Sequence, residues 1–142
     1  MATINILVVV DVEGATSSGN LASNVWMIDT GKYLGTVEAG NELITYANNG
    51  DKLQWSLAAV DPGTNLAFAP YSANPPSPFS GQAVPANINP QPVPLTNNTQ
   101  YIAQFSVPGG TKAGAQYQYR MTLAMDGKNY TFDPFLQLFT ST

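Results

Sequence analysis

The stretch Ile4-Asn5-Ile6-Leu7-Val8-Val9-Val10-Asp11 decides the fold class that the sequence predicts. From Ile4 to Val10 only one side chain is polar and most are β-branched, which is typical of a strand buried on both faces. The run ends at Asp11, whose carboxylate must find a donor, a cation or water. An α/β fold is the alternative, but no glycine-rich phosphate loop follows, and 15–24 is too rich in Ser, Gly and Asn for a useful helix.

Three later segments alternate apolar and polar residues with a period of two: 52–60, 101–107 and 115–125. This period predicts half-buried antiparallel strands. The side chains expected to point inward are Leu53, Trp55, Leu57 and Ala59; Tyr101, Ala103, Phe105 and Val107; and Tyr117, Tyr119, Met121, Leu123 and Met125.

Turn residues separate these strands. Asp126-Gly127 predicts a type I′ hairpin between 115–125 and 128–133, because both central residues of that turn need positive φ. Residues 48–51 predict a second hairpin, between 42–47 and 52–60, and 61–63 predict a turn that leads to 64–69. Pro134 is expected to end a ladder, leaving 135–139 as a terminal edge strand.

About eight to ten short strands at this spacing predict an all-β fold, an antiparallel Greek-key β-sandwich of immunoglobulin-like outline. At 142 residues the chain is expected to form a single domain over 1–142. The segment 70–94 holds eight of the eleven prolines, so we predict a Pro-rich loop there, either wrapping the sandwich or acting in recognition.

Composition excludes several classes of function. The chain has no Cys and no His, which removes disulfides, thiolate nucleophiles and catalytic histidine. Its acids are scattered singly, so no carboxylate pair marks an enzyme. The five Lys and Arg residues do not cluster, and with a net charge of −4 nucleic-acid binding is not expected. No signal peptide or transmembrane segment is recognisable, which predicts a cytoplasmic protein.

Four stretches carry a family resemblance: 4–14, 20–30, 40–43, and 125–127 together with 132–135. In these the chain resembles the AidA/PixA family of bacterial inclusion-body proteins. The resemblance implies a β-rich fold, cytoplasmic inclusions and control by cell density, and small relatives of the family are associated with pore-forming toxin operons. It implies no catalytic motif, and it does not extend to the segment 70–94.

Arg120, the only arginine, lies among glutamines and is a candidate for holding a carboxylate in two-point fashion. A structural ion pair with Glu13, Asp29 or Asp133 is the alternative. The amides could bind sugar hydroxyls, with Trp26, Trp55 or a tyrosine stacking on the sugar ring, although Trp55 and the tyrosines are more plainly explained as core residues. The candidate ligand-binding residues are Arg120, Gln118, Gln116 and Trp26, with Gln54 and Gln104 on the same expected amide face.

Asp11, Glu13 and Asp29 are candidate metal ligands, because carboxylates at strand ends suit a hard cation such as calcium. The alternative is that aspartates at turns, such as Asp61 and Asp126, cap their own backbones. No EF-hand spacing is present, and no other cofactor is expected.

Two hypotheses about function remain open. The first is a non-enzymatic protein that binds itself as a homo-oligomer or binds another protein, accessory to a toxin or density-controlled system. Sparse charge favours this hypothesis because copies repel one another little. The second is a carbohydrate-binding module, perhaps assisted by calcium.

Overall fold

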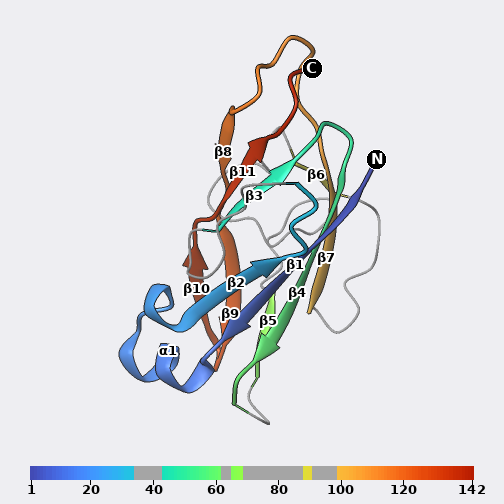
Figure 1. Cartoon of the computed structure of the whole chain (residues 1–142). Coiled ribbons are helices and arrows are strands. Elements are labelled where there is room, and N and C mark those ends of the chain that lie inside the picture. Colours follow the sequence, from blue (N-terminus) through green and yellow to red (C-terminus); the bar gives the residue numbers. More distant parts are fainter. Residues whose placement is uncertain (34–42, 62–64, 69–87, 91–98) are drawn as a thin grey trace.

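A computed structural model describes residues 1–33, 43–61, 65–68, 88–90 and 99–142. Over these residues the chain is all-β apart from one short α-helix and one 3₁₀ turn (Figure 1). In chain order the elements are β1 (Thr3–Val10), α1 (Val12–Ser18), η1 (Ala22–Asn24), β2 (Val25–Asp29), β3 (Ile44–Ala47), β4 (Lys52–Ala59), β5 (Ala67–Phe68), β6 (Ile88–Pro90), β7 (Gln100–Phe105), β8 (Gln116–Gln118), β9 (Met121–Met125), β10 (Lys128–Phe132) and β11 (Phe135–Leu138).

One layer of the sandwich is a five-stranded sheet in the order β2-β1-β4-β7-β6. Its pairs are antiparallel except β1 with β4, which run parallel in register from Thr3 opposite Lys52 to Val10 opposite Ala59. The sheet is therefore mixed, whereas the sequence predicted an antiparallel one. Most of the Pro-rich loop predicted at 70–94 lies outside the described residues. Within it, β6 pairs with β7 and carries Pro90 on an edge strand, where a missing N–H is tolerated.

Two three-stranded sheets, β10-β9-β5 and β3-β11-β8, form the opposite layer. Contacts between aromatic rings join the layers. The ring centroids of Trp55 in β4 and Tyr119 are 5.6 Å apart, and those of Phe105 in β7 and Tyr117 in β8 are 5.8 Å apart. The Trp55 indole N–H also donates a 3.1 Å hydrogen bond to the Tyr119 hydroxyl. This all-β sandwich is the predicted fold class, while Greek-key connectivity and a single domain over 1–142 stay predictions.

Most of the side chains that the alternating pattern places inward are buried, and Leu57 and Tyr117 are half-buried. Leu53, Trp55, Tyr101, Ala103 and Phe105 are all buried, as expected from their positions. Ala59 is an exception, because it is exposed at the end of β4.

The prediction that β1 is buried on both faces is wrong. Ile4, Ile6, Val8 and Val10 are buried, but Asn5 and Leu7 are exposed. The strand lies between β2 and β4 within its sheet, yet only its inward face meets the opposite layer. Apolar residues on both faces therefore leave one apolar face at the surface.

The segment 15–24 contains no long helix, but the sequence did not predict the two-turn helix α1, which spans Val12–Ser18 and ends within this segment. Its local signals are the caps: the Asp11 carboxylate accepts from the Gly14 N–H at 2.9 Å, and Gly19 ends the helix with φ of 71°. Val12 and Ala15 bury its inner side. Two well-capped turns form in spite of the unfavourable composition.

Of the two predicted hairpins, one forms. Asp126 and Gly127 have φ of 49° and 75°, and β9 pairs with β10 from Met125 opposite Lys128 onward. The hairpin predicted at 48–51 is wrong, because β3 pairs with β11 and β4 pairs with β1 and β7. The chain crosses between layers at this point. Of the turn and strand predicted over 61–69, only 65–68 and Asp61 are described, and β5 covers Ala67–Phe68.

The strand predicted over 115–125 is divided into β8 and β9, which belong to different sheets. On one side of the break, β8 pairs with β11, ending at Gln118 opposite Phe135. On the other side, β9 pairs with β10, beginning at Met121 opposite Phe132. Because the partner segment contains Pro134, it cannot supply a continuous set of N–H donors there. The prediction that 135–139 is an edge strand is wrong as well: β11 is the central strand between β3 and β8.

Candidate binding surface

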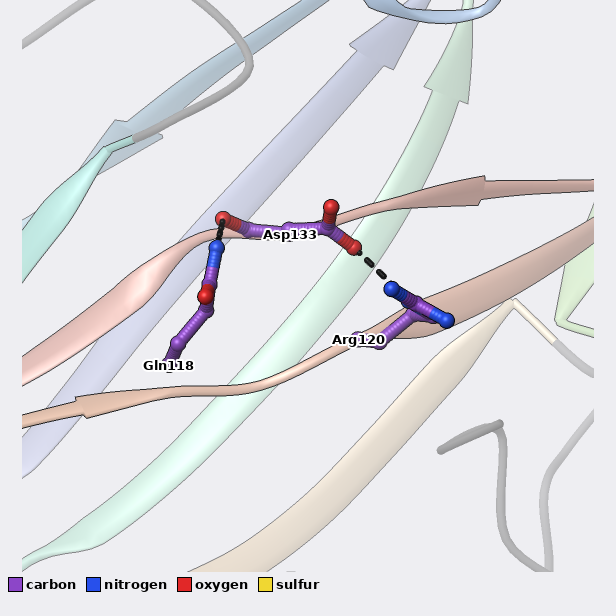
Figure 2. Close-up of polar contacts among 3 residues, drawn as sticks. All are labelled: Gln118, Arg120 and Asp133. Atoms are coloured by element: carbon purple, nitrogen blue, oxygen red, sulfur yellow. Dashed lines mark hydrogen bonds and ion pairs between the residues drawn. The ribbon is translucent and has the colours of Figure 1, made fainter. Parts of the chain in front are cut away.

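Arg120 lies at the break between β8 and β9, where it pairs with Asp133. Its Nε donates to the Asp133 carboxylate at 3.0 Å, and the Gln118 side-chain amide donates to the Asp133 carbonyl at 3.3 Å (Figure 2). Arg120 therefore forms the structural ion pair with Asp133, which was the alternative. The contact uses the Nε atom alone, so the guanidinium does not hold the carboxylate by two hydrogen bonds. The two side chains are 56% and 41% exposed, so the pair is solvated.

The predicted amide face is not a single surface. Gln116 and Gln118 belong to β8, and Gln116 donates to Gln137 of β11 at 2.7 Å. Gln54 and Gln104 belong instead to β4 and β7 of the five-stranded sheet, where the Gln104 amide donates to the Gly50 carbonyl at 3.2 Å. The amides are thus distributed over two sheets and are partly used in the fold.

Trp26 lies on β2, in a different sheet from Arg120 and the β8 glutamines. The four candidate ligand residues therefore separate into two locations. Trp26 is 41% exposed and points to the solvent side of its sheet, whereas Trp55 is fully buried.

An apolar area surrounds Trp26 on the outer face of β1 and β2. Leu7 lies opposite Ile28 in the register, and Val9 lies opposite Trp26, so the four side chains adjoin one another. Leu7 is 38% exposed, Ile28 48% and Trp26 41%, and Val9 is half-buried. We call Leu7, Val9, Trp26 and Ile28 the outer patch.

The outer patch continues into a neutral polar region. Across β1 and β4, Leu7 faces Ser56, Val9 faces Ala58, and Asn5 faces Gln54. None of these outward side chains carries a charge. Sequence reasoning missed the patch because 25–29 is apolar on both sides of the strand, so its alternation does not tell which side faces the core.

β2 also leaves a strand edge uncovered by the described residues. The Asp11 N–H donates to the Asn24 carbonyl, and the Thr30 N–H donates to the Asn5 carbonyl, so the backbone groups of Asn24 and Thr30 point toward the β1 side. Because the direction of the backbone groups alternates along a strand, those of Val25, Met27 and Asp29 point away from β1. In the described part of the chain β2 pairs with β1 alone.

The three candidate metal ligands have separate local surroundings, and within the described part of the chain hydrogen bonds engage the carboxylates of Asp11 and Asp29 but not that of Glu13. Asp11 caps α1, and the Glu13 backbone N–H donates to Asp61 at 3.1 Å. Asp29 accepts from the Gly31 N–H at 2.7 Å and from the Thr45 hydroxyl at 2.9 Å, which ties β2 to β3. Among the described residues no group of three or more His, Cys, Asp or Glu is placed to hold a metal ion. The calcium prediction receives no support from this arrangement.

A buried carboxylate that sequence reasoning did not single out lies at Asp51, which is 1% exposed. It accepts from the backbone N–H groups of Ala2 and Asn48, each at 2.8 Å, and from the Tyr33 hydroxyl. Burial, together with the hydrogen bond to Asp51, raises the pKa of Tyr33 to about 12. Burial likewise raises the pKa of Tyr119 above its ordinary value. These groups are built into the fold and do not form an acid–base pair.

No helix among the described residues has the length and apolar character needed to cross a membrane. A family model described as a domain of unknown function, DUF8788, matches residues 2–131. The chain belongs to the DUF8788 family. No curated protein matches this DUF8788 member.

Among solved structures, the DUF8788 chain is similar to the crystal structure of an inclusion body protein, PixA, from Burkholderia cenocepacia J2315. The two are 16% identical, the match covers 99% of this chain and 95% of that one, and the TM-score is 0.46. The AidA and toxin associations implied by the sequence resemblance stay predictions.

Proposed function

We propose that this protein is a non-enzymatic, self-associating protein of inclusion-body type, and that the outer patch contributes to its association. The observation that carries the proposal is the grouping of Leu7, Trp26 and Ile28 on the outer sheet face, with only uncharged side chains directly around them, at the edge strand β2. Contiguous apolar patches on a protein surface mark interaction sites. With charged residues making up 10% of the chain, repulsion between copies is weak.

Sedimentation velocity over a wide concentration range tests this function. The wild-type protein should show concentration-dependent association, and the double variant Trp26→Thr/Ile28→Thr should associate more weakly while keeping its thermal midpoint. Threonine retains β-propensity, so the change removes apolar surface and preserves the strand. The matched control is Val60→Thr, at a residue 57% exposed outside the patch. A wild-type protein that stays monomeric at every concentration would refute the function.

The wider role belongs to the same proposal. By the resemblance of 4–14 and the other family stretches, the assembly would form in the cytoplasm and be accessory to a toxin or density-regulated system. Its partners would be further copies of itself or another protein, and neither nucleic acid nor a membrane would be bound. Imaging of cells that express the chain, with and without the Trp26→Thr/Ile28→Thr double variant, tests whether inclusions depend on the patch.

A second candidate function is binding of a neutral sugar at Trp26. The favouring observation is that the uncharged polar side chains of Asn5, Ser56 and Gln54 lie on the same sheet face as the Trp26 ring, beyond Leu7 and Val9 in the register. Sugars bind such surfaces by packing C–H groups on the ring and hydroxyls on the amides. Arg120 takes no part in this candidate site, because it lies in the opposite layer and pairs with Asp133.

Thermal unfolding against a panel of neutral sugars, with calcium and with a chelator, separates the two functions. A ligand at about 100 times its dissociation constant contributes about 2.7 kcal/mol to stability. A shift with one sugar that disappears in Trp26→Thr and persists in Arg120→Gln supports the sugar site. A panel without any shift rules it out at ordinary affinities and leaves self-association.

A further inference from the structure

We propose that two copies of this chain associate by pairing the edges of their β2 strands that the described residues leave unpaired, antiparallel about a two-fold axis at Met27. The inference rests on the proposed self-association and names its contact. It would join the two five-stranded sheets into one continuous sheet, with the outer patches of both copies side by side on one face.

The backbone of β2 supports pairing with another strand. The N–H and C=O groups of Val25, Met27 and Asp29 point away from β1, and no described residue pairs with them. An unpaired row of this kind is a template for strand addition. Lys and Pro, which commonly protect an edge, do not occur between Val25 and Asp29.

The register follows from the overlap of the two strands. When Met27 faces Met27 of the second copy, all five residues of β2 are paired, and Val25 lies opposite Asp29. Trp26 then lies opposite Ile28 of the second copy, and the reverse pair repeats across the axis. Aromatic residues facing β-branched residues are favourable cross-strand pairs. A two-fold axis at Trp26 or Ile28 would leave some residues of β2 without a partner in the second copy.

The absence of charge around the axis also favours a second copy as the occupant. A two-fold contact places each surface against itself, so a charged face would repel its own copy. The outward side chains near the axis, at positions 5, 7, 9, 26 and 28, are all neutral. An edge of five residues is smaller than the roughly 800 Å² per partner of a standard interface, so the contact is expected to be weak and to act at high protein concentration.

Cysteine cross-linking tests the register, because the natural chain contains no cysteine. We would mix Trp26→Cys with Ile28→Cys at a concentration where the wild type associates, and oxidise with diamide. Positions 26 and 28 form non-hydrogen-bonded pairs, in which Cα atoms lie about 4.5 Å apart, within the range that a disulfide bridges. Intact mass spectrometry should find the mixed dimer as the main cross-linked species. Mixtures of Val60→Cys with either variant are the control and should stay uncross-linked.

Each outcome decides a specific point. Cross-linking of Trp26→Cys with itself, in place of the mixed dimer, would overturn the centre at Met27. Association of both the wild type and the mixed Cys variants by sedimentation, with no cross-link through 26 and 28, would overturn the β2 contact and leave the proposed function standing. Absence of wild-type association at all concentrations would overturn both.

Discussion

At the scale of single residues, the carboxylate of Asp51 organises the turn that carries the chain from one layer to the other. Its three donors come from Ala2, Tyr33 and Asn48, so one side chain holds the N-terminal strand and the 48–51 turn together. Because the carboxylate is 1% exposed, water cannot replace a lost acceptor.

We therefore expect Asp51→Asn to lower the free energy of unfolding by about 2–4 kcal/mol, since the amide nitrogen would face groups that already donate. Urea unfolding measures the change. Asp126→Asn is the control, with an expected effect within about 0.5 kcal/mol, because Asp126 is exposed and Asn tolerates its φ of 49°. Equal effects at both positions would contradict this account of Asp51.

Gly14 is required by close approach in α1. A Cβ atom there would lie 2.4 Å from the Asn24 side-chain oxygen and 2.6 Å from the carboxylate of Asp11, the cap of the helix. Gly14→Ala should destabilise the protein by about 1–3 kcal/mol, although alanine is the better helix former. Gly109→Ala, where a Cβ would meet nothing within 4 Å, is the comparison, and it should leave the thermal midpoint nearly unchanged.

Tyr33 predicts a pH dependence of stability. Its pKa is raised from 10.0 to about 12 in the folded protein, so its contribution is fully present below pH 10 and is lost as pH rises to about 12. Tyr33→Phe should be less stable at pH 8 by about 1–2 kcal/mol, because it loses the hydrogen bond to Asp51. The difference from wild type should shrink between pH 10 and 12. Urea unfolding of both proteins across this pH range measures the difference. A constant difference in the free energy of unfolding would disprove the raised pKa of Tyr33 as the cause.

At the scale of elements, the break between β8 and β9 and the break between β10 and β11 lie opposite each other. Tyr119 still donates its N–H to the Pro134 carbonyl at 3.0 Å, and Arg120 and Asp133 pair at the surface of the crossing. Both segments leave one sheet at this point and enter the other. The ion pair lies over the crossing but is too exposed to hold it alone.

A double-mutant cycle with Arg120→Gln and Asp133→Asn should give a coupling below about 1 kcal/mol, because both side chains are more than one third exposed. Chemical unfolding of the four proteins in low and high salt provides the measurement, and the coupling should fall as salt is added. A coupling of several kcal/mol that resists salt would show that the pair is a buried structural link or part of a larger site.

At the scale of the whole molecule, the charge of the surface hardly changes near neutral pH. The chain has no His, and its net charge is −4 with an isoelectric point of about 4.3. Histidine is the side chain with an ordinary pKa between about 6 and 8, and the chain has none, whereas the net charge approaches zero as pH falls toward the isoelectric point.

Self-association should therefore be constant from pH 6 to 8 and strengthen as pH falls toward 4.3, since repulsion between copies decreases. Light scattering at fixed protein concentration measures this, with circular dichroism at each pH as the control for folding. A transition in association near pH 6.5 would contradict the prediction, because the chain has no group with that ordinary pKa.

The all-β class and the inward faces of β4 and β7 could be predicted from the sequence, because period-two alternation is a local property of the chain. The type I′ turn at Asp126-Gly127 is local for the same reason: positive φ at two adjacent residues restricts which side chains can occupy them. The pairing of Arg120 with Asp133 was one of three alternatives, since charge alone does not choose among several acids.

The pairing partners of the strands were decided by the tertiary structure. A pattern of alternation is the same whether 44–47 pairs with 52–59 as a hairpin or with β11 across the layer, and here packing of both layers onto one core selects the latter. The exposed face of β1 and β2 was decided in the same way. Residues 6–10 and 25–28 are apolar on both sides, and only the position of the opposite layer determines that Ile6 and Met27 are buried while Leu7, Trp26 and Ile28 meet solvent.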